Sequence, residues 1–371
     1  MNVINENISE NPYLLLTPGP LTTTKTVKSV MLRDYCTWDD DYHVIIRTIR
    51  SHLVRLSGGS SAHTATLMQG SGTYCVEGTL STSVPDNGKL LILSNGAYGR
   101  RMAEIAKRAR IPYVEIDFGE TDPIFPARVA DALENYADIT HVSLVHLETT
   151  TGMLNPAKDV CNLAKSHGKT VILDAMSSFG GIPINMAEYG ADFLISSANK
   201  CIQGVPGFGF ILSDIDELKK CEGRARSLSL DVYDQWKTME EKGGKWRFTS
   251  PTHVVRAFAR ALEELDEEGG VEKRYERYRE NQRRLVTGMK ESGFAPLLPE
   301  ELQSPVITAF HSPKTDSWNF NRFYALLKER GFVIYPGKVT KADTFRIGNI
   351  GDVKPDDINR LIEAVKSVMW W

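Results

Sequence analysis

Short apolar segments alternate with helical segments between about residues 60 and 215, and this alternation is the strongest constraint on the fold. The apolar segments lie at residues 90–93, 142–146, 171–173, 193–195 and 208–212. One intervening helix has Asn155 as its predicted cap, Pro156 as its first residue and Gly168 after its last turn. Strands and helices in this order favour a mostly parallel sheet covered by helices, so we predict an α/β fold.

The pattern changes after about residue 252. A highly charged helical segment at 271–292 leads into separated strand candidates, and an amphipathic helix at 356–369 follows them. The strand candidates are residues 305–310, 332–335 and 345–347. A chain of 371 residues has room for about two domains. The predicted division is an N-terminal arm at 1–20, a large domain at 21–265 and a small α+β domain at 266–371.

Charge and hydropathy exclude several classes of partner. The 44 Lys and Arg residues nearly balance the 47 Asp and Glu residues, so no broad positive field is available for nucleic acid or an anionic membrane. No apolar run approaches the roughly 18 residues of a membrane helix, and the polar start lacks the pattern of a signal peptide. We expect a cytoplasmic protein with no nucleic-acid or membrane partner. Its five cysteines should be reduced and mostly buried.

Lys200 carries the strongest local signal for chemistry. It follows the apolar segment 193–195 and two serines, and the ends of strands in doubly wound sheets are where such folds bind ligands. Most loop lysines are simple surface residues. A partly desolvated lysine at a strand end, however, has a lowered pKa and can attack an aldehyde, as the lysine of a pyridoxal-phosphate enzyme does.

Asp174 is the predicted partner of this lysine. It ends the segment 171–173, and the 26 residues from Asp174 to Lys200 fit one crossover of a parallel sheet. Both side chains would then face the same crevice. A pyridoxal cofactor needs an anion at its ring nitrogen, which Asp174 can supply. The alternative interpretation is an ordinary turn or helix-cap aspartate.

A phosphate cup is predicted at Gly70-Ser71-Gly72-Thr73, between an extended piece and a helix. Backbone N–H groups, hydroxyls and the helix N-terminus would hold the phosphate there, although short Gly/Ser turns are also common without any ligand. Tyr98 lies on a strand-to-helix turn and is the candidate for stacking on the cofactor ring. A core tyrosine is the alternative.

Arg346 is the leading candidate for binding a substrate anion. Its strand neighbours Phe345 and Ile347 are apolar, so its side chain would point the other way and could clamp a carboxylate or phosphonate. An exposed strand arginine is the bland alternative. No metal site is predicted, because the chain has no HExxH and no Cys-x-x-Cys pattern. His146-Leu147-Glu148 is interpreted as a structural strand end.

These residues lie in longer segments that together resemble one family. The segments are LLLTPGP (14–20), CTWDDDY (36–42), HLETTTGM (146–153), DAMSSFG (174–180) and residues 196–207, 226–231, 246–253 and 332–338. In this order they resemble the fold-type I pyridoxal-phosphate aminotransferases of the class-V branch, which includes alanine–glyoxylate and serine–pyruvate transaminases. Segments 36–42 and 196–207 narrow the resemblance to the 2-aminoethylphosphonate–pyruvate group.

The resemblance implies a large domain with a mostly parallel seven-stranded sheet, a small α+β C-terminal domain, and a homodimer with active sites at the subunit interface. It also implies pyridoxal 5'-phosphate as cofactor. The implied catalytic residues are Lys200 and Asp174. The implied cofactor-binding residues are Ser71, Gly72, Thr73, Tyr98, Thr149, Asp174 and Lys200, with Thr249 reaching the phosphate of the neighbouring subunit. The implied substrate-binding residues are Arg346, Thr17 and Trp38.

By the same resemblance the enzyme moves the amino group of 2-aminoethylphosphonate to pyruvate, giving phosphonoacetaldehyde and L-alanine in phosphonate degradation. Lys200 would act as general base and acid. An alanine–glyoxylate or serine–pyruvate specificity is the alternative. A cysteine desulfurase is disfavoured because no cysteine follows Cys221. A ligand-sensing regulator is disfavoured because too few residues precede Thr17 for a DNA-binding segment.

Overall fold

A seven-stranded sheet forms the centre of the large domain in the computed structural model, which describes residues 11–371. The strand order is β2-β10-β9-β8-β5-β3-β4. The strands are β2 (His63–Gln69), β3 (Leu90–Ser94), β4 (Tyr113–Asp117), β5 (His141–Val145), β8 (Thr170–Asp174), β9 (Phe193–Ser197) and β10 (Phe208–Asp214). Only β10 runs antiparallel to its neighbours in this sheet of the described chain. The predicted mostly parallel α/β sheet is confirmed.

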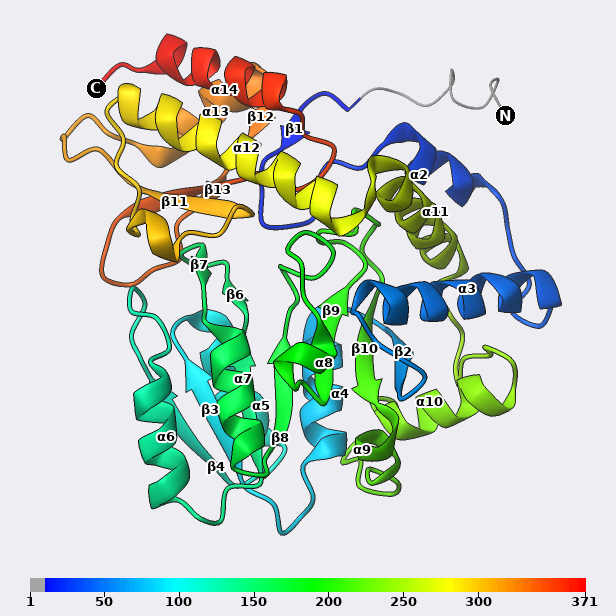
Figure 1. Cartoon of the computed structure of the whole chain (residues 1–371). Coiled ribbons are helices and arrows are strands. Elements are labelled where there is room, and N and C mark those ends of the chain that lie inside the picture. Colours follow the sequence, from blue (N-terminus) through cyan, green and yellow to red (C-terminus); the bar gives the residue numbers. More distant parts are fainter. Residues whose placement is uncertain (1–10) are drawn as a thin grey trace.

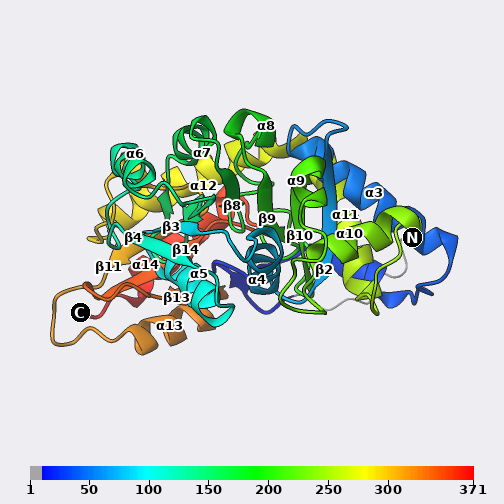
Figure 2. The ribbon, with the colours of Figure 1, turned by 90° about the horizontal axis from the view of Figure 1, so that it is seen from below.

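Helices cover both faces of this sheet. Figure 2 shows α6 (Pro126–Asn135), α7 (Ala157–Ser166) and α8 (Met186–Tyr189) above it, with α4 (Gly72–Ser83) and α5 (Ala97–Arg108) below. Successive side chains of a strand point to opposite faces, so strands buried on both faces are apolar throughout. In β3, for example, Leu91 and Leu93 pack in one core cluster while Leu90 and Ile92 pack in the other. This is why the sequence shows unbroken apolar runs.

The predicted cap of α7 is wrong. The N-cap position belongs to Pro156, and the helix begins at Ala157. The side chain of Asn155 instead donates to the carbonyl of Val145 at 2.9 Å and accepts from Asn95 Nδ2 at 2.7 Å. A buried amide must satisfy its hydrogen-bonding groups, and here the two buried asparagines do so by bonding to each other across the strand ends.

The small domain packs three helices against a short sheet in the order β11-β14-β13 (Figure 1). Its elements are α12 (Gly270–Glu291), β11 (Ile307–His311), α13 (Phe320–Glu329), β12 (Phe332–Val333), β13 (Tyr335–Pro336), β14 (Thr344–Gly348) and α14 (Pro355–Val368). The strand expected at 332–335 is split, because β12 pairs with β1 (Leu14–Leu15) whereas β13 pairs with β14. The N-terminal segment therefore adds a strand to this domain.

The remaining elements lie between these units or beside the large sheet. They are α2 (Lys25–Ser29), η1 (Val30–Leu32), α3 (Asp40–Leu56), β6 (Leu147–Glu148), β7 (Met153–Leu154), α9 (Ile215–Lys219), α10 (Val232–Glu241), α11 (Thr252–Glu268) and η2 (Glu300–Leu302). No helix in residues 11–371 is both long and apolar enough to cross a membrane. Four cysteines are buried, Cys36 is exposed, and none of the five is in a disulfide.

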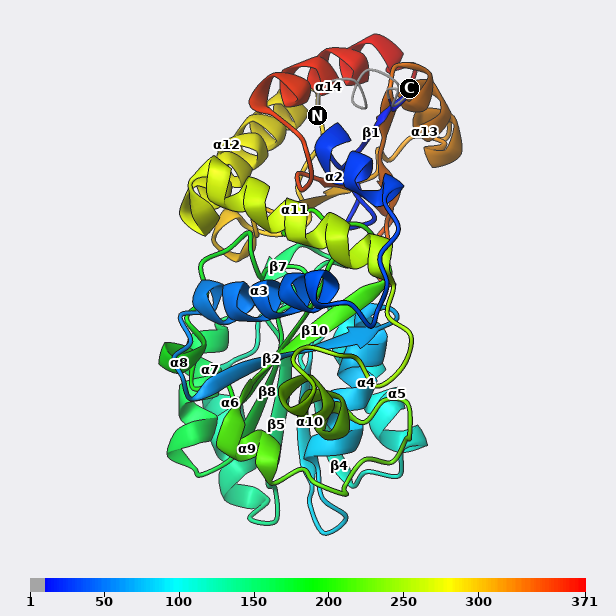
Figure 3. The same cartoon turned by 90° about the vertical axis from the view of Figure 1, so that its right-hand side faces the viewer.

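The two domains meet at α11, which Figure 3 shows between them. The buried residues of α11 belong to the large-domain core, and the helix ends at Glu268 before Gly269. The division after residue 265 falls in the last turn of this helix and stays a prediction. Residues 1–10 of the predicted arm lie outside the described residues. Leu16, further along, packs in the small-domain core.

Candidate active site

A cavity of about 200 Å³ opens at the carboxyl ends of β8 and β9. Six of the predicted site residues line it: Ser71, Gly72, Thr73, Tyr98, Asp174 and Lys200. The other lining residues are Arg101, Val145, Leu147, Met176, Ser177, Ser197 and Asn199. Parallel strands bring their carboxyl ends to one edge of the sheet, so residues distant in sequence converge there.

Lys200 follows β9 and points into this cavity. Its Nζ donates a hydrogen bond to the Pro18 carbonyl at 2.5 Å. Gly19 beside it has φ +116°, and a Cβ there would lie 2.8 Å from Nζ, so only glycine leaves room for the lysine. Burial lowers the pKa of Lys200 to about 8, and the charge of Arg346 acts in the same direction. The neutral amine, which is the nucleophilic form, is thereby favoured.

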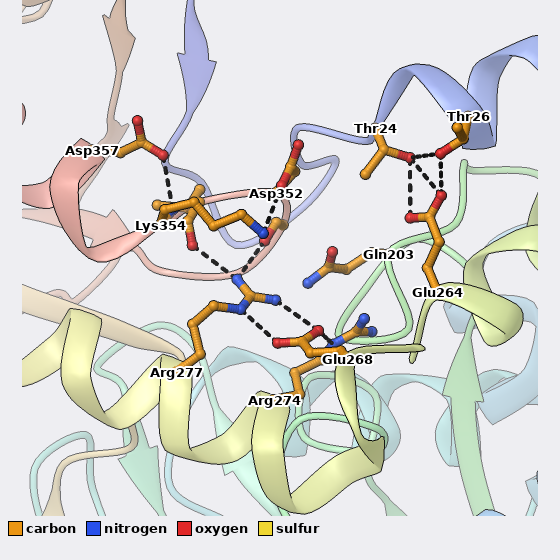
Figure 4. A network of polar contacts seen from close by, with 12 residues as sticks. Thr24, Thr26, Gln203, Glu264, Glu268, Arg274, Arg277, Asp352, Lys354 and Asp357 are labelled. Atoms are coloured by element: carbon orange, nitrogen blue, oxygen red, sulfur yellow. Dashed lines mark hydrogen bonds and ion pairs between the residues drawn. The ribbon is translucent and has the colours of Figure 1, made fainter. Parts of the chain in front are cut away.

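The turn that carries Lys200 is held by a partly buried ion-pair network (Figure 4). Arg274, only 2% exposed, donates from NH1 to the Cys201 carbonyl at 2.9 Å and from Nε to Glu268 Oε2 at 2.8 Å. Glu268 also accepts from Arg277 Nε at 2.7 Å, and Arg277 NH1 donates to the Val353 carbonyl at 2.8 Å. The lysine turn is therefore connected through the end of α11 to the small domain.

Asp174 is the last residue of β8 and lies on the cavity floor. Its Oδ1 accepts from the backbone N–H of Met176 at 2.9 Å. Burial raises the pKa of Asp174 to about 6, although the charges of Arg101 and Lys200 oppose that rise. A protonated ring nitrogen placed against this carboxyl would stabilise its ionised form.

The first residues of α4 form the predicted phosphate cup. Ser71 is the N-cap, and its side chain makes no capping hydrogen bond. The first N–H groups of a helix lack intrahelical acceptors and attract anions. A Cβ on Gly72 would come 2.2 Å from Met176 Sδ, so glycine is required for this close approach. Thr73 Oγ1 accepts from Arg101 NH1 at 3.3 Å, which adds a positive charge to the cup.

Arg101 also lines the cavity, although it is not among the site residues predicted from the sequence. Its guanidinium carbon lies 4.9 Å from the centroid of the Tyr98 ring. Tyr98 is in the first turn of α5, and its backbone N–H donates to Glu148 Oε2 at 3.1 Å. The spacing of three residues from Tyr98 to Arg101 places both on one helix face, and that spacing was a signal available in the sequence.

Arg346 lies on β14, above the cavity and not in its lining. It is 3% exposed, so the alternative of an exposed strand arginine is wrong. Its Nε donates to the Pro336 carbonyl and its NH1 to the Thr149 carbonyl, both at 2.9 Å. These two bonds fix the guanidinium. Thr149 Oγ1 is buried and has no hydrogen-bond partner within the described residues, so it is free to bond to a ligand.

Five predicted residues do not line the cavity: besides Thr149 and Arg346, they are Thr17, Trp38 and Thr249. Thr17 Oγ1 donates to the Pro20 carbonyl and so shapes the turn against Lys200. Trp38 is 74% exposed, with Lys245 Nζ 4.5 Å from its ring centroid. Thr249 is exposed in the loop between α10 and α11. Substrate contact by Thr17 and Trp38, and contact of Thr249 with a second subunit, stay predictions.

The cavity offers the amine of Lys200, the carboxyl of Asp174 at a strand end and the N-terminus of α4. The Thr149 hydroxyl belongs to a residue outside the lining. These groups fit a small molecule with an aldehyde, a basic ring nitrogen, a ring hydroxyl and a phosphate. Within the part of the chain that the structure describes, no three His, Cys, Asp or Glu side chains gather as a metal site.

Comparison with known proteins agrees with this geometry. Residues 29–346 match the family described as aminotransferase class-V. A 2-aminoethylphosphonate–pyruvate transaminase of Syntrophobacter fumaroxidans is 61% identical over 97% of each chain. One of Vibrio vulnificus is 58% identical over 98% of this chain and 99% of the relative.

Among solved structures, a pyridoxamine–pyruvate aminotransferase of Mesorhizobium loti superposes with a TM-score of 0.88 at 23% identity, covering 96% of this chain and 92% of the other. At that identity the likeness speaks for the fold alone, which is that of an aminotransferase. The evidence for the narrower family comes from the relatives that match nearly the whole chain at 58–61% identity. The chain belongs to the class-V aminotransferases and, within them, to the 2-aminoethylphosphonate–pyruvate transaminases.

Proposed function

We propose that this enzyme transfers the amino group of 2-aminoethylphosphonate to pyruvate, giving phosphonoacetaldehyde and L-alanine. The observation that carries the proposal is 58–61% identity to transaminases of that name over nearly the whole chain. The cavity agrees, because a buried lysine and a strand-end aspartate lie on its walls together.

Pyridoxal 5'-phosphate is the cofactor that fits the cavity. Lys200 would bind its aldehyde carbon, Asp174 its ring nitrogen and the start of α4 its phosphate. Tyr98 would cover one ring face, and the unpartnered Thr149 hydroxyl would bond the ring hydroxyl. When bound, the cofactor supplies an electron sink for the carbon that loses its proton.

Lys200 then does the proton chemistry of the reaction. Its Nζ would take a proton from the substrate carbon and later release it, acting as general base and then as general acid. A pKa of about 8 suits this work, because a group with a pKa near the working pH both accepts and releases a proton. Asp174 would hold a proton on the ring nitrogen of the bound cofactor.

Arg346 would bind the acidic group of each substrate in turn: the phosphonate of the amine and the carboxylate of pyruvate. Its guanidinium is preoriented by the Pro336 and Thr149 carbonyls. Preorientation limits the entropy lost when a substrate binds. The net charge of −3 provides no general attraction for anions, so placed cations must do this.

A kinetic comparison tests the specificity. Purified enzyme should have a far higher kcat/KM with 2-aminoethylphosphonate and pyruvate than with alanine or serine and glyoxylate. The reverse order would replace this function with the alanine–glyoxylate or serine–pyruvate alternative.

A homodimer with shared active sites is part of the same proposal. Two large aromatic side chains beside the phosphate cup, Tyr74 and Phe248, are solvent-exposed in the single chain and line one pocket with Gly70. Exposed apolar side chains gathered in one region favour a protein interface. Sedimentation equilibrium should give twice the 41.5 kDa chain mass, and a monomer at micromolar concentration would contradict the dimer.

A further inference from the structure

Lys338 stands at the mouth of the site without an assigned role. Its Nζ lies 5.2 Å from the centroid of the Tyr98 ring, and Tyr98 lines the cavity. Over residues 11–371, this ammonium group forms no ion pair and no hydrogen bond. Burial lowers the pKa of Lys338, and the positive charges of Arg101 and Arg346 add to that effect, while the carboxylate of Glu148 opposes it. Lys338 therefore lies within electrostatic reach of both arginines.

Hydrogen bonds hold the backbone of the loop that carries Lys338, both before and after this residue. Before it, the Pro336 carbonyl accepts from Arg346 Nε at 2.9 Å, and Gly337 N–H donates to the Thr344 carbonyl at 3.0 Å. After it, Thr340 N–H donates to Glu120 Oε2 of the large domain at 2.7 Å. These anchors on each side fix the loop backbone at Lys338, so its side chain starts from a set position beside Tyr98.

The charges of the two acidic substrates suggest a role for the Lys338 ammonium. A phosphonate, like a phosphate ester, carries up to two negative charges near neutral pH, whereas the carboxylate of pyruvate or alanine carries one. Arg346 supplies one positive charge, and two of its donors already bond to carbonyls. A single guanidinium balances a carboxylate but leaves one charge of a phosphonate dianion unbalanced.

We propose that Lys338 is a specificity-determining residue, which supplies the second positive charge for the phosphonate of the amine substrate and contributes little to the carboxylate substrates. This assignment rests on the proposed function. It explains how one site accepts two acidic groups of different charge: Arg346 serves both, and Lys338 serves the dianion.

The test measures the two half-reactions separately in Lys338→Met, with Lys341→Met in the same loop as the matched control. The holoenzyme is mixed with 2-aminoethylphosphonate alone, or with alanine alone, and the loss of cofactor absorbance is followed at pH 8. We expect kcat/KM for 2-aminoethylphosphonate to fall about fivefold and that for alanine to change by no more than about twofold, since ion pairs at an exposed mouth are modest. Lys341→Met should match the wild type, and Lys338→Arg should restore the rate.

Inhibition by unreactive anions gives a second readout. Ethylphosphonate should inhibit Lys338→Met about fivefold more weakly than wild type, while inhibition by propanoate stays the same. Equal losses for both anions, or no loss for either, would overturn the assignment. Failure of the wild-type enzyme to react with 2-aminoethylphosphonate would instead refute the proposed function, so the two failures are distinguishable.

Discussion

The two halves of the site are built differently. The strand-end half, with Lys200, Asp174 and the start of α4, lines the cavity at one edge of the large sheet. The small-domain half, with Arg346 and Lys338, reaches over the cavity from β14 and the loop before it. The strand-end half holds the groups for chemistry, and the small-domain half holds the cations for selecting acids. Variants in the first should therefore affect cofactor and rate, and variants in the second should affect substrate binding.

The largest effect is expected for Lys200→Ala. Because Lys200 both binds the cofactor and moves the proton, turnover should fall by roughly 10⁴-fold, the upper range for loss of a positioned acid–base group. The visible absorbance of the holoenzyme should disappear. Steady-state assays and an absorbance spectrum measure the two effects. Near-normal turnover in this variant would contradict the assignment of the chemistry to the strand-end half.

Asp174→Ala should rank second. Losing one partner of a buried charge pair costs about 3–5 kcal/mol, so kcat should fall by roughly 10³-fold. Some cofactor should remain bound, because the lysine and the phosphate cup are intact. Cofactor content measured after gel filtration, beside kcat, separates these effects. Unchanged activity would argue against a ring-nitrogen partner at this position.

Arg346→Gln probes the other half. Charge-assisted hydrogen bonds contribute about 1.5–3 kcal/mol, so kcat/KM should fall roughly 10- to 100-fold for 2-aminoethylphosphonate and pyruvate alike. The absorbance of the holoenzyme should stay normal, in contrast with Lys200→Ala. A lost or shifted absorbance would show that the two halves are not separable in this way.

The smallest effect concerns the pH dependence of the free energy of unfolding, through His146, a buried residue that follows β5. Burial lowers the pKa of His146 to about 4, whereas an unfolded chain has a histidine pKa near 6.5. Between these values the unfolded state binds more protons, so stability falls as pH falls. Going from pH 7 to pH 5, this one group should remove about 2 kcal/mol.

His146→Asn should therefore show a shallower loss of unfolding free energy over that pH interval in urea titrations. The exposed His167→Asn serves as the control and should follow the wild type. Parallel pH profiles for wild type and His146→Asn would refute the buried neutral histidine.

The sequence alone placed Asp174 and Lys200 at strand ends, but it did not predict the hydrogen bonds between residues far apart in the chain. Asp174 and Lys200 could be located because each lies at or shortly after the end of an apolar strand, which is a local pattern. Glu148 was interpreted as a structural strand end, yet it is fully buried and accepts from Tyr98 N–H. No local sequence pattern around Glu148 predicts this hydrogen bond, because Tyr98 lies 50 residues earlier in the chain.

The error at Asn155 has the same origin. Asparagine is a favoured helix cap, but the side-chain oxygen of Asn155 accepts a hydrogen bond from Asn95, which lies 60 residues away in the chain. Local propensity predicts which conformations a residue favours, and tertiary hydrogen bonds decide which one it adopts. The small-domain half depends on such long-range contacts: Arg346 is fixed by a carbonyl of the other domain, and the loop of Lys338 by Glu120.

The most direct test of the account is an absorbance titration of the purified enzyme with 2-aminoethylphosphonate and no acceptor. We predict that the cofactor absorbance bleaches as one phosphonoacetaldehyde forms per active site, and that added pyruvate restores the absorbance while alanine appears. An enzyme whose absorbance is unchanged by 2-aminoethylphosphonate but bleached by alanine or serine would contradict the account.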